Sequence, residues 1–202
     1  MTAIVIWLAA LLTSLTPDLP NEYKSGRTLD EAQELAINAR LQVSVEIVEV
    51  AYSEDERPLY TGPFARAQTA ALLASIAGFE TRLRPRIRMG HCLPNECDHG
   101  EAVSIMQIHP GKWGMRLTDT GFRYCASISD GCDGFPELIA HEQLAVKYAL
   151  RKLRQNGLAS YTGEGFQGPV TKLRRETAAR WVAERTPPMS DAEVVRAEIA
   201  SE

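Results

Sequence analysis

Hydrophobic residues recur at helical spacing along much of the chain. Thr28 and Glu31 form the capping-box pattern that opens a helix, and apolar side chains follow three or four residues apart. Further along, the alternation of Val43, Val45 and Ile47 also fits a strand, which leaves the end of this element open.

Three later stretches carry the same periodicity. An alanine-rich helix is expected over about residues 64–83, because Pro85 disfavours helix in the residue before it. An amphipathic helix is expected over about residues 136–155, with Gly157 at the position of a C-terminal cap. A further helix is expected over about residues 170–185. The pattern predicts a mainly α fold with long loops and little β-sheet.

The longest irregular stretch, residues 85–134, is rich in Gly, Cys and Asp. Loops of this length usually carry function. The chain of 202 residues suits one domain, which we place at residues 28–186. Residues 1–27 form an N-terminal apolar segment and linker, and residues 187–202 a polar C-terminal tail. We expect a monomer.

The N-terminal apolar run ends near Leu12 and is too short to span a bilayer comfortably. It has the length of a signal-peptide core, but no basic residue precedes it. A secretion signal, a mis-assigned start, a core helix and a loose anchor with weak membrane association all remain open.

The net charge of -4 argues against nucleic acid as a partner. Basic residues nevertheless gather at residues 82–88, 151–154 and 172–175. These groups are typical of solvated helix and loop faces, and they also fit local attraction to an anionic polymer such as a cell wall.

The four cysteines fall into two local pairs, Cys92 with Cys97 and Cys125 with Cys132. The pattern predicts one disulfide within each pair and an exported, periplasmic or extracellular protein. The alternatives are unpaired thiols and a zinc site made of Cys92, Cys97 and the neighbouring His91 and His99.

Glu80 is the candidate acid. It shares one face of its predicted helix with Leu73 and Ile76, so its carboxyl group is expected to be partly buried. Burial disfavours the charged form and raises the pKa of a carboxyl group, as protonation of a glycosidic oxygen requires. The alternative is a structural glutamate paired with an arginine such as Arg82 or Arg84.

Three motifs support the catalytic interpretation. Residues 77–83 (AGFETRL) resemble the A-x-x-E-S-x-F signature of soluble lytic transglycosylases and goose-type lysozymes. Residues 104–110 (SIMQIHP) resemble the G-L-M-Q-I-x-P motif of that superfamily, and residues 159–165 (ASYTGEG) resemble its A-x-Y-N-x-G motif. The motifs occur in the family order over about residues 64–165. The resemblance implies a lysozyme-like helical domain.

The resemblance also implies a role for each matching residue. Glu80 would act as general acid and then as general base. Gln107 would hold the sugar in the cleft, and Tyr161 would orient Glu80 through a hydrogen bond. Met106 would line the floor of a sugar subsite, and Ser104 belongs to the same substrate-binding motif.

Three positions depart from the family pattern. Ser104 replaces a glycine, so the backbone there is less free, and Thr162 replaces an asparagine, which puts the role of that side chain in doubt. Thr81 replaces a serine and keeps the hydroxyl. Gly163 would permit the tight turn after the tyrosine of its motif.

The expected activity is lytic cleavage of the β-1,4 bond between N-acetylmuramic acid and N-acetylglucosamine, with peptidoglycan glycan strands as the partner and with no cofactor or metal. Hydrolysis would need a second carboxylate, for which Asp98 and Glu101 are the candidates. A non-catalytic wall-binding or virion protein with the same fold is the remaining alternative.

Overall fold

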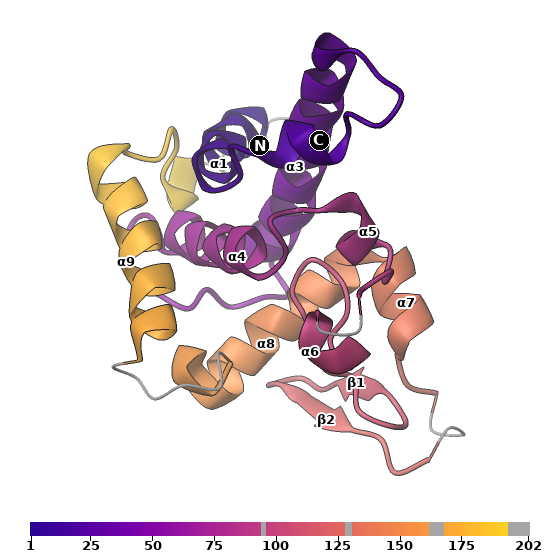
Figure 1. Cartoon of the computed structure of the whole chain (residues 1–202). Coiled ribbons are helices and arrows are strands. Elements are labelled where there is room, and N and C mark those ends of the chain that lie inside the picture. The colour runs from indigo at the N-terminus through magenta and orange to yellow at the C-terminus, as the bar shows by residue number, and fades with distance from the viewer. Residues whose placement is uncertain (94–95, 128–130, 162–167, 194–202) are drawn as a thin grey trace, which may run out of the picture.

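The protein is mainly helical in a computed structural model, which describes residues 1–93, 96–127, 131–161 and 168–193 (Figure 1). The elements are α1 (Thr2–Leu15), α2 (Leu19–Glu22), α3 (Leu29–Tyr52), α4 (Ala65–Thr81), α5 (Pro85–Arg88), α6 (Cys97–Gly100), β1 (Met115–Leu117), β2 (Phe122–Tyr124), α7 (Phe135–Ala140), α8 (Glu142–Tyr161) and α9 (Pro169–Glu184). The two strands pair antiparallel. The predicted mainly α architecture with little sheet is confirmed.

Helix α4 lies at the centre of the core, where it packs against α1, α3 and α9 (Figure 1). Most of its residues are buried, and its many alanines let neighbouring helices approach closely. At Gly78, an added Cβ would lie only 3.0 Å from Cδ1 of Leu15. The glycine therefore admits the end of α1 two residues before Glu80.

Both segments that were expected outside the helical domain contact it. In the C-terminal segment, the N–H of Asp191 donates to the carbonyl of Pro63 at 2.9 Å. Helix α1 buries Ile4 and Leu8 in the core, so the N-terminal run is a core helix in this structure. Nε1 of Trp7 donates to the carbonyl of Arg185 at 2.8 Å, which joins α1 to the end of α9. Within the described ranges, no helix has the length and apolar character needed to cross a membrane.

Helix α3 runs without interruption through the stretch that also fitted a strand. The predicted capping box is present, because the side chain of Thr28 accepts from the N–H of Glu31 and that glutamate accepts from the N–H of Thr28. Val43 and Ile47 are buried and Val45 is exposed. Residues four apart share a helix face, so the strand interpretation is wrong here.

The single helix expected over residues 136–155 is instead two helices. The backbone leaves helical geometry at His141 (φ -129°, ψ 84°), which separates α7 from α8. The carbonyl of His141 accepts from the N–H of Ala145, so this residue begins α8. Gly157 has φ +75° and interrupts the last part of α8, as its predicted capping position implies.

Both predicted disulfides are present, Cys92–Cys97 and Cys125–Cys132. They staple the loops on either side of the β1–β2 hairpin. Because Cys92 and Cys97 are bonded to each other, the alternative zinc site with thiolate ligands is excluded. Two disulfides are typical of a protein in an oxidising compartment.

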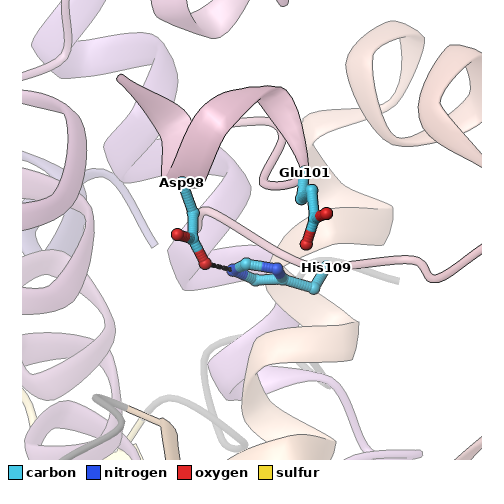
Figure 2. A group of neighbouring side chains, drawn as sticks. All are labelled: Asp98, Glu101 and His109. Atoms are coloured by element: carbon cyan, nitrogen blue, oxygen red, sulfur yellow. Dashed lines mark ion pairs between the residues drawn. The ribbon is translucent and has the colours of Figure 1, made fainter. Parts of the chain in front are cut away.

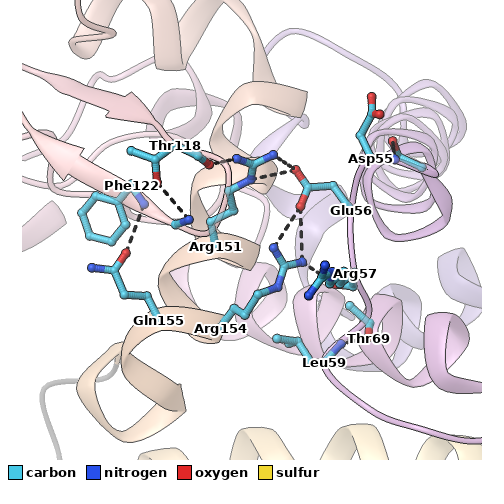
Figure 3. Close-up of polar contacts among 12 residues, drawn as sticks. Asp55, Glu56, Arg57, Leu59, Thr69, Thr118, Phe122, Arg151, Arg154 and Gln155 are labelled. Atoms are coloured by element: carbon cyan, nitrogen blue, oxygen red, sulfur yellow. Dashed lines mark hydrogen bonds and ion pairs between the residues drawn. The ribbon is translucent and has the colours of Figure 1, made fainter.

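One face of α8 holds the hairpin (Figure 3). The hydroxyl of Tyr148 donates to the carbonyl of the first β1 residue at 2.8 Å. One turn later Arg151 donates to the carbonyl of Thr118, and Oε1 of Gln155 accepts from the N–H of Phe122 at 3.1 Å. Residues spaced three and four apart thus form one line of contacts along the helix.

The loop after α3 is attached to the same helix through Glu56, which is 1% exposed (Figure 3). Its Oε1 accepts from Nε and Nη2 of Arg151 at 2.9 and 2.7 Å. Its Oε2 accepts from both terminal nitrogens of Arg154 at 3.3 Å. Both oxygens of this buried carboxylate are therefore used in joining the loop to α8.

Candidate active site

The last turn of α4 positions Glu80. The hydroxyl of Thr81 donates to the carbonyl of Ala77 at 3.0 Å and accepts from the N–H of Leu83 at 3.1 Å. Arg82 adopts the left-handed conformation (φ 51°) that ends the helix. The hydroxyl of Thr81 thus fixes the backbone next to the candidate acid.

Glu80 is partly buried between two cations. Its Oε1 accepts from Nη2 of Arg174 on α9 at 2.7 Å, and the side chains are 21% and 7% exposed respectively. Burial raises the pKa of Glu80, whereas the charges of Arg174 and Lys152 lower it, and the net shift is upward. The carboxyl group therefore keeps its proton to a higher pH than an ordinary glutamate.

The arginines that follow Glu80 in the sequence point elsewhere. Arg82 donates to the carbonyl of Leu15 at 3.4 Å, and Arg84 pairs with Glu22 at 3.1 Å. Arg82 is the left-handed residue that ends α4, and Arg84 lies beyond it. The alternative interpretation of Glu80 was an ion pair with Arg82 or Arg84. Glu80 does pair with an arginine, but that arginine is Arg174 on α9.

Tyr161 lies beside Glu80 but does not hydrogen-bond it, so the expected contact is wrong. Its hydroxyl donates to the carbonyl of Met106. Burial and then the nearby charge of Glu80 raise the pKa of Tyr161 well above its ordinary value. Nζ of Lys152 lies 5.0 Å from the centroid of the tyrosine ring. Glu80, Lys152 and Tyr161 therefore share one neighbourhood.

A tight turn supplies the Met106 carbonyl. Val103 and Ile108 exchange both backbone hydrogen bonds at 2.9 Å and close the turn. Ser104 has φ 69° and Gln107 has φ 47°, both in the left-handed region. Glycine adopts this left-handed backbone without strain, whereas a serine at position 104 costs about 1–2 kcal/mol.

The side chains of this turn do not lie as the resemblance implies. Met106 and Ser104 are both 0% exposed, so neither side chain can line an open sugar subsite in this structure. Nε2 of the half-buried Gln107 donates to the carbonyl of Ser104 at 3.1 Å, and the amide therefore braces its own turn. The turn contacts Tyr161 through its backbone. Thr162 and Gly163 lie outside the described residues.

Two spaces beside α8 differ in size. The gap between the hairpin and α8, lined by His109 and Lys152 among other residues, is too small to hold a water molecule. A cavity of about 510 Å³ lies elsewhere, between α3, α5, α7 and α8, and Glu80 is not among its lining residues. The case for a site thus depends on the side chains around Glu80.

Asp98 and Glu101, the candidates for a second carboxylate, are exposed and face His109 (Figure 2). Oδ2 of Asp98 lies 3.5 Å from Nε2 of His109. Lys152 and Arg174 were recognised only as members of basic groups, because their partner is distant in sequence; Arg174 lies 94 residues from Glu80. Only the packing of α8 and α9 brings these cations to the acid.

No family model, curated protein or solved structure matches this chain. The family relationship therefore remains a prediction from the three motifs.

Proposed function

We propose that the protein cleaves the glycan strands of peptidoglycan as a lytic transglycosylase, with Glu80 as its single catalytic acid. The observation that carries the proposal is a partly exposed carboxyl group with a raised pKa, held at the rigid end of a core helix. A general acid needs a proton at working pH and access to the leaving group.

The surroundings of Glu80 fit both halves of the reaction. Protonated Glu80 donates to the glycosidic oxygen, and the substrate's acetamido group stabilises the developing cation. Ionised Glu80 then removes the proton from the C6 hydroxyl, whose oxygen closes the anhydro ring. Arg174 holds Oε1, and among the described residues Oε2 accepts no hydrogen bond. The charges of Arg174 and Lys152 stabilise the carboxylate that exists between the two steps.

Replacement of Glu80 by glutamine tests the proposal. The amide can still accept from Arg174 but cannot transfer a proton, so the rate of clearing of purified cell walls should fall at least about 100-fold. Glu34→Gln, an exposed change on α3, should leave the rate unchanged. Circular dichroism checks the fold of both variants. Undiminished clearing by Glu80→Gln overturns the proposal.

The pH dependence gives a second measurement. Because the pKa of Glu80 is raised, the protonated acid persists above the pH at which ordinary glutamates ionise. Activity should fall as the pH rises through this raised pKa. Removal of the Arg174 charge by Arg174→Met should shift that fall to higher pH, since the guanidinium lowers the pKa.

Two other functions would give different outcomes. Hydrolysis would employ the exposed Asp98 or Glu101 to activate water, and mass spectrometry of the digest would then find reducing ends instead of anhydro ends. A wall-binding protein without turnover would use the Glu80–Arg174 pair only for stability. Wall binding without any released muropeptide would identify that case.

A further inference from the structure

Three metal-ligating side chains meet on the disulfide-stapled loop and the turn that follows it (Figure 2). One oxygen each of Asp98 and Glu101 and one ring nitrogen of His109 lie within 4.8 Å of one another. The side chains of Asp98 and His109 are 65% and 36% exposed, so solvent reaches the group. The residues proposed for glycan cleavage do not include this group.

The backbone holds these ligands close together. The Cys92–Cys97 disulfide anchors the start of the short α6 turn. The N–H of Glu101 donates to the carbonyl of Asp98 at 3.1 Å, so the two carboxylates leave the same tight turn. His109 directly follows Ile108, which is paired with Val103 in the adjoining turn. Ligands on a braced backbone lose little conformational freedom on binding.

We infer that Asp98, Glu101 and His109 form a binding site for a divalent transition-metal ion, with Zn²⁺ as the representative ligand. Donors bonded to one tetrahedral zinc at about 2.0–2.1 Å lie roughly 3.4 Å apart. Asp98 and His109 already stand 3.5 Å apart. An oxygen of Glu101 lies within 4.8 Å of both, so its exposed side chain would rotate inward to reach the ion, and water would fill the fourth position.

Charge and ligand chemistry favour this class of ion. Two carboxylates near one another repel, and a doubly charged cation replaces that repulsion with attraction. The single histidine ring nitrogen between two carboxylate oxygens suits zinc and its neighbours better than calcium or magnesium, which prefer oxygen ligands alone. Metal binding at this site would be a function separate from the proposed glycan cleavage, which uses no metal.

Calorimetric titration of Zn²⁺ into the chelator-stripped full chain tests the inference. A single ion should bind per chain, and His109→Ala should weaken that binding roughly tenfold or more. His91→Ala removes an exposed histidine that directly precedes Cys92 and lies outside the group, and it should change the affinity by less than about twofold. Circular dichroism establishes that both variants fold.

Three results overturn the inference. The first is the absence of saturable binding below about 1 mM Zn²⁺. The second is single-ion binding that His109→Ala leaves unchanged, and the third is an equal loss in both histidine variants. Asp98→Asn, which keeps the size of the side chain, should reproduce the loss seen with His109→Ala. Glycan cleavage is measured separately, so its failure leaves this result unaffected.

Discussion

Glu56 and Glu80 are two glutamates that each meet two cations, but their carboxyl groups differ. Glu56 is 1% exposed, and both of its oxygens accept from arginines on α8 (Figure 3). The side chain of Glu80 is 21% exposed, and one of its oxygens accepts from a single arginine on α9.

The difference separates a structural carboxylate from one that is free to react. A carboxylate with both oxygens bonded to guanidinium groups is held in one position, with no oxygen left to meet a substrate. Burial raises the pKa of Glu80. Because Arg174 bonds only Oε1, the other carboxyl oxygen can carry the proton. The number of bonded oxygens and their access to solvent are thus better guides to chemistry than the presence of an arginine nearby.

The largest effect is expected from Glu56→Ala. Two mostly buried arginines would lose their shared partner, so the free energy of unfolding should fall by about 3–5 kcal/mol. Glu80→Ala should lower it less, by about 2–3 kcal/mol, because one buried arginine instead of two loses its partner and burial had already destabilised the carboxylate. Urea unfolding of both variants measures the contrast. Equal losses would remove the distinction between the two glutamates.

A smaller loss is expected from Tyr161→Phe. The carbonyl of Met106 would lose its donor in buried surroundings, which should lower the free energy of unfolding by about 1–2 kcal/mol. Tyr124→Phe, at an exposed tyrosine, should stay within about 0.5 kcal/mol. Thermal or urea unfolding compares the two. A loss no larger than that of the control would show that this hydrogen bond does not stabilise the site.

The smallest effect is a gain from Ser104→Gly. Glycine adopts the left-handed backbone at φ 69° without strain. It also raises the conformational entropy of the unfolded chain, which offsets part of the gain. The net increase in the free energy of unfolding should be about 0.5–1 kcal/mol. Ser75→Gly, the same change inside α4, should instead destabilise the protein by roughly 0.5–1 kcal/mol. Destabilisation by both variants would contradict the assigned strain.

Part of the site could be predicted from the sequence. The periodicity of α4 placed Glu80 on its apolar side, and the raised pKa of its carboxyl group follows from that burial. The Tyr161 contact could not be predicted, because the carbonyl that accepts from it belongs to a turn 55 residues away. The buried side chain of Met106 likewise depends on how that turn packs.

Several local features of this protein followed from the sequence alone. The Thr28 capping box and the Gly157 interruption depend on hydrogen bonds and backbone preferences within a few residues. The partners of Glu56 and Glu80 lie 94 to 98 residues away and meet them only after the helices have packed. Helix formation is decided by neighbours along the chain, whereas the protonation and exposure of an acid are decided by whatever the fold places beside it.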